Sequence, residues 1–516
     1  MQIAFKGAWA IFGVLIYFGI FPQDLGREAS SGIGTFLGFY CALSVLFSAQ
    51  FKSRILRSVL VFVYIVLPSL SLGYWILTRS FFNADMLYAV FQTSPAEARE
   101  YCQQFLGVSV LLYPLLIAAL LAGIGKWHDP KEWSRKRKAL FVLVALFAIA
   151  YEPEVRLLYT SSSSYVKELR QYQKIMAQKK VWSDLRATTK AGRGELHVIV
   201  LGESLNRNHM SLYGYPRETT PHMDRQPDLI VFQDMISCDM GTPGVLGQAL
   251  TLADSENELE FFKVPSVIEV AKAAGFKTYW LSNQQTFGPF DNLTTVLASS
   301  ADEKIFMNRN IGWGSGKNSW DEVLLPVLDK ILARDAATAG PKLIFIHLMG
   351  SHTAYKFRYP EKFDVFKMAK TGRPDMDTLA EYDNTVLYTD DVVSKLIQRI
   401  SQTGLCATLT FISDHGEDVE GKRGHNSSLG CKAMVEIPFV IWASPEYRKQ
   451  NPEVLRTLRA ATKLPLMNDI FDRFIFLLTR VETPGMEIQY RLPPPGQATK
   501  PRRVVAGKYG YGSLPG

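Results

Sequence analysis

Cysteine is scarce in this chain, with five residues at positions 41, 102, 238, 406 and 431 of 516. The odd total excludes complete pairing within one chain, so at least one thiol is unpaired or intermolecular. No spacing among the five fixes a disulfide, and a bond between Cys406 and Cys431 stays open for a domain outside the cytoplasm. Internal repeats and low-complexity tracts are also missing, and the length leaves room for more than one domain.

Ionisable residues are nearly absent from the hydrophobic runs in the first 151 residues. A helix that crosses the hydrocarbon core of a membrane needs about 20 apolar residues. Five runs approach this length: 5–21, 33–49, 55–77, 104–125 and the shorter 139–151. No small-residue cleavage site follows the first run, which argues against a signal peptide. A transporter would carry ionisable groups inside its spans, which argues against that class.

Basic residues are unevenly distributed among the connections between these runs. They are concentrated after the second and fourth runs, at 52–57 and 126–138, and sparse after the first and third. The positive-inside rule places the two basic connections in the cytoplasm and everything after residue 151 outside it. The pattern therefore predicts a multi-pass protein of a bacterial inner membrane with its large domain in the periplasm.

Three regions follow from this topology. Residues 1–151 are predicted to be a transmembrane anchor with a periplasmic loop at 78–103. Residues 152–193 are a linker in which four serines break the structure before an interfacial helix, and 194–516 form the periplasmic catalytic domain. The formal net charge of +8 suits anionic lipid or a phosphorylated glycolipid, and nucleic acid is a poor fit outside the cytoplasm. We expect a monomer.

The region after residue 194 alternates short β-branched runs with helix-like segments. The expected strands are 196–201, 277–282, 342–348, 407–412 and 437–443, and the expected helices are near 266–275, 320–334 and 378–401. Nearly continuous hydrophobicity marks strands that are buried on both faces, as in parallel sheets. The fold class is therefore an α/β domain with a mainly parallel sheet between helices, attached to an α-helical membrane domain.

Polar residues follow several of these strands at the edge where ligands of such sheets collect. Glu203 follows the first strand, and Asp414 and His415 follow the fourth. A single acid at such a place is equally explained as a helix N-cap. Three donors from two strand ends favour a metal site, and oxygen and nitrogen ligands without thiolates suit Zn²⁺, or less well Mn²⁺.

Thr242 precedes Pro243, a pair that fits the first turn of a helix. A hydroxyl there would lie beside backbone N–H groups that bind phosphate oxygens, and metal coordination would make it a nucleophile. From spacing alone, a plain N-cap is the favoured interpretation of Thr242.

Motifs along nearly the whole chain then carry a family resemblance. They are NADMLYAVFQTSPAEA (83–98), VIVLGESLNRNHMSLYGYPRETTPHMD (198–224), GTPGVLGQALT (241–251), YWLSNQQT (279–286), HLMGSHTAYKFRYP (347–360), YDNTVLYTDD (382–391) and SDHGEDVEGKRGH (413–425). In this order they resemble the phosphoethanolamine transferases of the alkaline phosphatase/sulfatase superfamily. The resemblance implies a phosphatidylethanolamine donor, a lipopolysaccharide acceptor and contact with membrane lipids.

The resemblance also implies roles for individual residues. The residues that match zinc ligands are Glu203, Thr242, Asp414 and His415, with Thr242 also the nucleophile. His352 and His425 match histidines that handle the phosphoryl group and the leaving or entering oxygen. Two further matches are weaker: Asn283 matches a residue that contacts the phosphate, and Glu97 matches an acidic loop residue that binds the lipid substrate. One zinc ion is expected, and a second beside the histidines is left open.

Several features separate the chain from its near rivals. Cys238 has no second cysteine a few residues past the nucleophile, and GYPRETTP and SNQQT resemble the branch that acts on a core heptose more than the lipid A branch. The alternatives are a lipid A-directed enzyme, a phosphoglycerol transferase resembling lipoteichoic acid synthases and, remotely, a non-catalytic membrane scaffold. The stretch 237–241 lacks the C/S-x-P-x-R pattern that a formylglycine sulfatase requires.

Overall fold

The chain forms two compact units in the computed structural model, Met1–Thr93 with Cys102–Glu168, and Ser94–Tyr101 with Leu169–Gly516. The structure describes residues 40–42, 44–45, 53–67, 87, 90, 93, 98–100, 133–149, 153–178, 182, 184–257, 259–284, 293–308, 319–335, 340–367, 374–421, 423–484 and 503–516. The segment 94–101 therefore folds with the large C-terminal part of the chain, although it lies within the N-terminal third of the sequence.

The first unit contains helix α3 (Arg54–Val61), which continues into the π-helix Phe62–Val66, and helix α8 (Arg135–Ala148). The Tyr64 hydroxyl donates to the Ala145 carbonyl oxygen at 2.7 Å and joins the two segments. Large apolar side chains on α8, such as Leu143 and Phe147, are exposed. The five predicted spans fall largely outside the described residues. Of the helices that are described, none has both the length and the apolar character to cross a membrane, and the five spans stay a prediction.

Helix α9 (Pro153–Gln178) runs without interruption through the four serines at 161–164. The prediction that these serines break the structure is wrong. Serine and threonine in a helix can turn their hydroxyls back to carbonyls of the preceding turn, as Thr160 does toward the Arg156 oxygen at 2.9 Å. Serine is only mildly unfavourable inside a helix, so a long helix that begins at a proline tolerates the run.

A seven-stranded sheet forms the centre of the second unit, in the order β3-β9-β8-β2-β7-β5-β6. These strands are β2 (Leu196–Gly202), β3 (Ile230–Val231), β5 (Lys277–Ser282), β6 (Glu303–Phe306), β7 (Lys342–His347), β8 (Ala407–Ser413) and β9 (Phe439–Ala443). Strands β8, β2, β7, β5 and β6 run parallel to one another, whereas β9 is antiparallel to both β8 and β3. The mainly parallel sheet is confirmed, and 437–443 supplies its antiparallel member.

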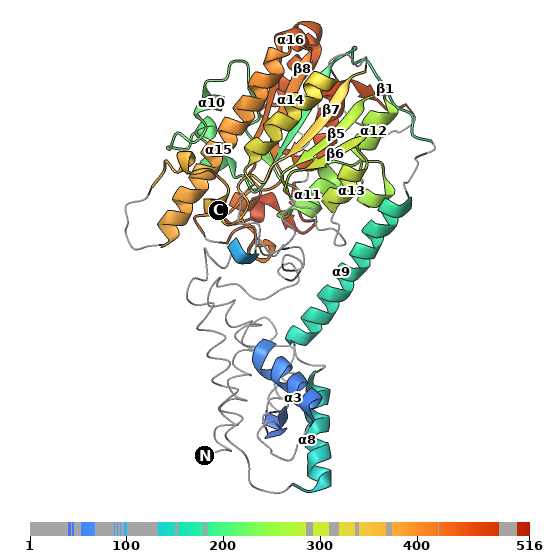
Figure 1. Ribbon diagram of the computed structural model, residues 1–516, viewed down its shortest axis with the longest axis vertical. Coiled ribbons are helices and arrows are strands. Elements are labelled where there is room, and N and C mark those ends of the chain that lie inside the picture. The colour runs from blue at the N-terminus through green and yellow to red at the C-terminus, as the bar shows by residue number, and fades with distance from the viewer. Residues whose placement is uncertain are drawn as a thin grey trace. The chain divides into compact units, whose positions relative to one another are not determined.

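Helices cover both faces of this sheet (Figure 1). Along β2, Ile199 and Leu201 enter one core and Val198 and Val200 the other, so the strand is buried on both sides. The first core includes side chains of α11 (Thr242–Ala249), α12 (Val267–Ala273), α13 (Leu293–Ser299), α16 (Pro445–Gln450), α17 (Pro452–Ala461) and α18 (Phe471–Thr479). The second includes side chains of α14 (Leu325–Arg334) and α15 (Pro374–Gln402). All three predicted helices are present, as α12, α14 and α15.

Smaller elements complete the described part of this unit. They are helix α10 (Pro221–Asp224) and three two-stranded pairs, β1 (Thr188–Thr189) with β11 (Val481–Glu482), β4 (Met235–Ile236) with β10 (Leu466–Met467), and β12 (Val504–Val505) with β13 (Tyr509–Gly510). The four described cysteines, Cys41, Cys238, Cys406 and Cys431, are all free. The Cys406–Cys431 disulfide left open by the sequence is therefore not formed.

The register of β2 against β8 sets the functional edge of the sheet. Gly202 pairs with Ser413, so Glu203 and Asp414 leave neighbouring parallel strands at the same level. The Asp414 N–H donates to the Gly202 oxygen at 3.1 Å and extends this pairing by one residue. Strands β7 and β5 end at the same edge, where their loops meet those of β2 and β8.

Candidate active site

Thr242 is the first residue of α11, and Gly241 occupies the N-cap position. The Thr242 hydroxyl lies 2.6 Å from Oδ2 of Asp414, and 3.2 and 3.4 Å from the two carboxylate oxygens of Glu203. The plain N-cap interpretation is wrong because Gly241 and not Thr242 occupies the N-cap position, and the Thr242 side chain faces the two acids. Pro243 is tolerated as the second residue of the helix, because N–H groups in the first turn have no acceptor within the helix.

Backbone N–H groups hold the Asp414 carboxylate in place. Its Oδ1 accepts from the N–H of Ser204 at 3.0 Å and from the N–H of His415 at 2.7 Å, which leaves Oδ2 directed to Thr242. The Ser204 hydroxyl donates to Oε1 of Glu203 at 3.0 Å. Ser204 has a positive φ of 55°, a conformation that non-glycine residues rarely adopt. This turn directs its N–H to Asp414 and its hydroxyl to Glu203.

His415 completes the group with a fixed tautomer. Its Nδ1 lies 2.8 Å from the Gly416 carbonyl oxygen, which can only accept, so Nδ1 carries the proton. The other ring nitrogen, Nε2, faces Oε1 of Glu203 at 3.3 Å and Oδ2 of Asp414 at 3.5 Å, and it would be the metal-binding atom once its proton is lost. A backbone carbonyl that fixes one ring nitrogen is the usual support of a metal-binding histidine.

Burial sets the electrostatics of these three groups. Burial, followed by the Glu203 charge, raises the pKa of Asp414 to about 6. Burial acts to raise the pKa of Glu203 as well, but hydrogen bonding to His415 holds it below its usual value. Burial lowers the pKa of His415, yet Asp414 and Glu203 outweigh it and raise that pKa to about 10. Two buried carboxylates beside each other thus favour a positive charge between them.

The residues present fit a zinc ion. The ligand atoms of Glu203, Asp414 and His415 lie within 4.8 Å of one another, and all three residues are buried. Zinc–oxygen and zinc–nitrogen bonds of about 2.1 Å in a tetrahedron place the ligand atoms about 3.4 Å apart. Four of the separations among these groups, 3.2 to 3.5 Å, match that spacing, and the shorter Thr242–Asp414 distance of 2.6 Å is that of a hydrogen bond.

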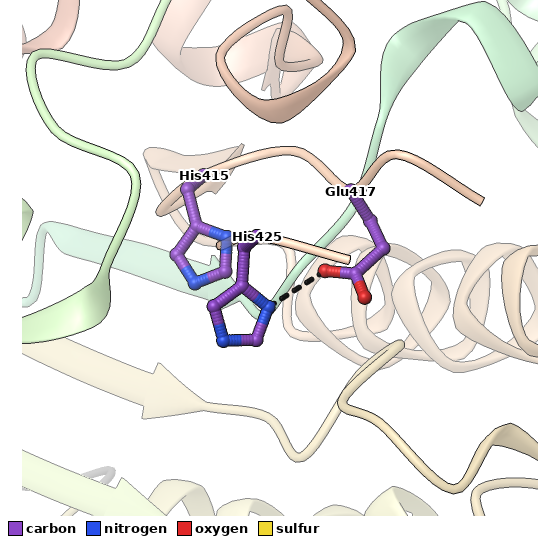
Figure 2. A group of neighbouring side chains, drawn as sticks. All are labelled: His415, Glu417 and His425. Carbon is purple, nitrogen blue, oxygen red and sulfur yellow. Dashed lines mark hydrogen bonds and ion pairs between the residues drawn. The ribbon is translucent and has the colours of Figure 1, made fainter. Parts of the chain in front are cut away.

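His425 lies beside His415, with ring centroids 4.7 Å apart. Figure 2 shows the ring of His425 bonded to the Glu417 carboxylate. The distance from Nδ1 to Oε2 is 2.8 Å, and the other Glu417 oxygen accepts from the Tyr355 hydroxyl at 2.7 Å. Ligand atoms of His415, Glu417 and His425 also lie within 4.8 Å of one another, so a second cation could be held there. Glu417 therefore serves to orient a histidine of the site.

His352 lies on the loop after β7, and this loop approaches Glu203 closely. The Ser351 N–H donates to the backbone carbonyl oxygen of Glu203 at 2.9 Å. Gly350 adopts a φ of 53°, and a Cβ at this position would lie 2.9 Å from backbone atoms of Glu203. The charge of His352 is near enough to lower the pKa of Glu203. Among the described residues, its own Nδ1 has no hydrogen-bond partner.

The two weaker candidates differ from the rest. The side chain of Asn283 donates to the Ser319 oxygen at 2.9 Å and to Asp321 at 2.8 Å, within the protein. Its neighbour Gln284 instead donates to Oε2 of Glu203 at 3.3 Å and to the Leu348 oxygen at 2.9 Å. The phosphate contact of Asn283 stays a prediction. Glu97 lies outside the described residues.

Sequence reasoning missed the residue that ties the two halves of the site together. Nδ2 of Asn468 donates to the backbone carbonyl oxygen of Asp414 at 3.0 Å, and its Oδ1 accepts from the Cys238 N–H at 2.8 Å. It thereby fixes the loop that leads to Thr242 against the loop that carries Asp414. Only the pairing of β10 with β4 brings Asn468 there, and no local motif indicates that contact.

Comparison with known proteins agrees with this geometry. The model of the family described as Sulfatase matches residues 196–471, and the model described as Phosphoethanolamine transferase EptA/EptB matches residues 39–191. Phosphoethanolamine transferase EptC of Escherichia coli is 28% identical over 501 residues, covering 86% of this chain and 85% of its own.

Two solved structures share the fold. The zinc complex of the periplasmic domain of Escherichia coli EptC superposes with a TM-score of 0.56 at 28% identity, covering 64% of this chain and 96% of that domain. The integral membrane protein EptA of Neisseria meningitidis covers 93% of this chain and 96% of its own, with a TM-score of 0.65 at 18% identity. The second likeness concerns the fold alone.

The seven-stranded sheet, with Glu203, Thr242, Asp414 and His415 at its carboxyl edge, is the fold of enzymes of the alkaline phosphatase/sulfatase type. The chain belongs to the sulfatase family. Within it, the predicted kinship with the phosphoethanolamine transferases is confirmed, because the N-terminal match and the EptC relative both fall in that branch.

Proposed function

We propose that this protein transfers phosphoethanolamine from phosphatidylethanolamine to a sugar of lipopolysaccharide, with Thr242 as the nucleophile. The observation that carries the proposal is the placement of the Thr242 hydroxyl 2.6 Å from Asp414 and 3.2 Å from Glu203, at the N-terminus of α11. A threonine that merely starts a helix would not face two buried carboxylates. The EptC relatives, named as phosphoethanolamine transferases, support the choice of transferred group.

Glu203, Thr242, Asp414 and His415 would hold one zinc ion. When bound, zinc supplies Lewis acidity, which lowers the pKa of a coordinated hydroxyl and offsets negative charge on a phosphoryl oxygen. The zinc complex of the EptC domain supports zinc as the metal. A second ion, if the enzyme uses one, would be held by Glu417 and His425, because Nε2 of His415 is used for the first ion and its Nδ1 faces the Gly416 carbonyl oxygen.

The first half-reaction forms a bond between Thr242 Oγ1 and the phosphorus of the lipid. The bond from phosphorus to the diacylglycerol oxygen breaks, and a phosphoethanolamine–threonine remains on the enzyme. The N-terminus of α11 offers backbone N–H groups to the phosphoryl oxygens. Thr242 is held by Asp414, so its oxygen approaches the phosphorus from one fixed direction, as an in-line displacement requires.

The histidines handle the protons. The leaving diacylglycerol oxygen takes a proton from His352 or His425, and the same residue accepts a proton from the sugar hydroxyl in the second half-reaction. Glu417 accepts a hydrogen bond from Nδ1–H of His425, so Nε2 of this ring is the nitrogen that exchanges the proton. In the first half-reaction the Thr242 hydroxyl gives its proton to Oδ2 of Asp414, to which it already donates. In the second, the phosphoryl group moves from Thr242 to the sugar oxygen, and that proton returns from Asp414 to the threonine oxygen.

A core heptose is the proposed acceptor, on the strength of the GYPRETTP and SNQQT motifs and of Cys238, which has no neighbouring cysteine. The proposed location is the inner membrane, with the catalytic unit in the periplasm. The five apolar runs, the basic connections and the exposed Leu143 and Phe147 of α8 support it. The lipid donor would remain in the membrane while its headgroup reaches Thr242.

The test is an assay of purified full-length protein with phosphatidylethanolamine and, separately, phosphatidylglycerol. We expect release of diacylglycerol and a mass increase of phosphoethanolamine on the peptide containing Thr242 with the first lipid only. Transfer from phosphatidylglycerol alone would replace the proposal with a phosphoglycerol transferase. Mass spectrometry of lipopolysaccharide from the host then locates the group on a heptose or on lipid A.

A further inference from the structure

We propose that Glu100 is a positioning residue for the active site. Through Arg358 it fixes the backbone that carries His352, and so joins the segment between the third and fourth predicted spans to the catalytic unit. The proposal rests on the proposed function, since it assumes that His352 takes part in phosphoryl transfer. Glu100 belongs to the segment Ser94–Tyr101, which folds with the second unit.

Arg358 is buried, with 7% of the residue exposed, and its guanidinium makes three contacts. Its Nε donates to the His352 carbonyl oxygen at 3.2 Å, and Nη2 donates to the Thr353 oxygen at 3.1 Å and to Oε2 of Glu100. The contact to Glu100 is an ion pair whose two side chains are 6% and 20% exposed. One planar group therefore connects Glu100 to the loop at His352.

A second buried acid holds the other end of the same loop. Asp321 accepts the N–H groups of Met349 and Gly350 at 2.8 and 3.0 Å. The loop is thus fixed by Asp321 where it leaves β7 and by Arg358 at the carbonyls of His352 and Thr353. Ser351, which is bonded to the Glu203 backbone, lies between these two anchors.

The Nδ1 of His352 has no hydrogen-bond partner within the described part of the chain, so no bond at this atom holds the ring if its backbone moves. A buried guanidinium needs a counter-charge, and removing one partner of such a pair destabilises the other. Without Glu100, Arg358 would turn toward solvent and release the His352 and Thr353 carbonyls. The fork of Arg358 makes this arrangement specific, because lysine could not reach all three acceptors in one plane.

The experiment compares Glu100→Gln and Arg358→Lys with the wild type in the full-length protein. The control is Arg399→Lys, which alters a guanidinium that likewise contacts a carboxylate, Asp329, and a backbone carbonyl, that of Lys395. We expect kcat to fall about a hundredfold in both test variants, because small displacements of a reacting group have effects of that size. The KM for the lipid and the zinc content should stay near wild-type values.

Hydrogen–deuterium exchange gives a readout that does not depend on activity. Peptides covering 348–358 should exchange faster than in the wild type in both test variants, and at the wild-type rate in Arg399→Lys. Unchanged exchange and kcat in Glu100→Gln and Arg358→Lys would overturn the proposal, as would an equal loss in the control. A wild type without transferase activity would end the proposed function, while the exchange data would still decide whether Glu100 fixes the loop.

Discussion

Thr242 and Asp414 lie 172 residues apart in the chain, yet the threonine hydroxyl is 2.6 Å from the aspartate Oδ2. Two separate features produce this contact. Asp414 leaves β8 at the carboxyl edge of the sheet, and α11 begins at that edge with Thr242 as its first residue. Of the four groups, the hydroxyl is the one that the proposed mechanism uses as the nucleophile.

Removing that hydroxyl is expected to abolish transfer without removing the metal site. In Thr242→Ala, Glu203, Asp414 and His415 remain, so zinc should still bind while turnover falls by at least about ten thousandfold, the scale seen when a nucleophile is deleted. Diacylglycerol release and zinc content of the purified variant measure the two effects.

Thr242→Ser is the matched control for this change. Serine retains the hydroxyl and loses only a methyl group, so we expect measurable turnover and a mass increase on the same peptide. If Thr242→Ala kept wild-type turnover, another group would have to be the nucleophile.

Metal removal is expected to stop the reaction and lower stability together. Glu203 and Asp414 are buried side by side, so their mutual repulsion is offset when a divalent cation binds. A ligand that binds only the folded state stabilises it by about 2.7 kcal/mol at roughly 100 times its Kd. Treatment with a chelator should therefore lower both the melting temperature and turnover, and zinc should restore them.

Asp414→Asn separates metal binding from folding in the same experiment. Its amide oxygen can still accept the N–H groups of Ser204 and His415, so the loop should keep its shape. The lost charge weakens zinc binding, and added zinc should raise the melting temperature of this variant less than that of the wild type. An equal rise in both would remove Asp414 from the ligand set.

Most of the sheet and the grouping of the candidate ligands could be predicted from local patterns. The strands that end at Gly202, Ser282, His347 and Ser413 are continuous apolar runs, and polar residues follow each of them at one edge of the sheet. Proximity of Glu203, Asp414 and His415 then followed from parallel strand geometry alone. The role of Thr242 did not, because its spacing also fits an N-cap, and the family resemblance supplied it.

Contacts that depend on tertiary structure could not be predicted. Asn283 and Gln284 are adjacent amides, and only the loop geometry decides that Gln284 reaches Glu203 while Asn283 bonds Asp321. The prediction that the serine run in α9 breaks the structure was wrong for a different reason. The helix propensity of serine is only slightly unfavourable, and the 26-residue helix continues through the run. The pairing of Glu100 with Arg358 spans 258 positions and has no local signal.

Gly350 is expected to be intolerant of any side chain. Its φ of 53° is costly for other residues, and a Cβ there would lie 2.9 Å from backbone atoms of Glu203. Gly350→Ala should therefore destabilise the catalytic unit by about 1–3 kcal/mol for the backbone strain, with a further cost from displacement of Glu203. Chemical denaturation and zinc titration measure these two effects.

Gly404→Ala is the control, because Gly404 has a similar φ of 65° but open space where a Cβ would lie. It should lose stability to a similar strain and keep its zinc affinity. Equal zinc affinity in Gly350→Ala and the wild type would show that the loop can move away from Glu203 without consequence.

Glu195 is expected to govern the acid stability of the catalytic unit. The Glu195 side chain is 1% exposed. It accepts two hydrogen bonds from Arg480, at 2.7 and 2.9 Å, and its Oε1 lies 3.1 Å from Nε2 of His197. Burial acts to raise its pKa, but His197 and Arg480 outweigh burial and lower the pKa from 4.5 to about 2. A depressed carboxyl pKa stabilises the fold above pH 4.5, and that contribution is lost as the pH falls toward 2.

In Glu195→Gln the charge is absent at every pH, so we expect a loss of about 3 kcal/mol in the free energy of unfolding at pH 7. The difference from the wild type should shrink between pH 4.5 and about 2, the window that the pKa shift sets. Urea denaturation at a series of pH values measures it, with the exposed Glu446→Gln as the control. A difference that stays constant from pH 7 to 2 would mean that lost packing, and not the charge of Glu195, accounts for the destabilisation.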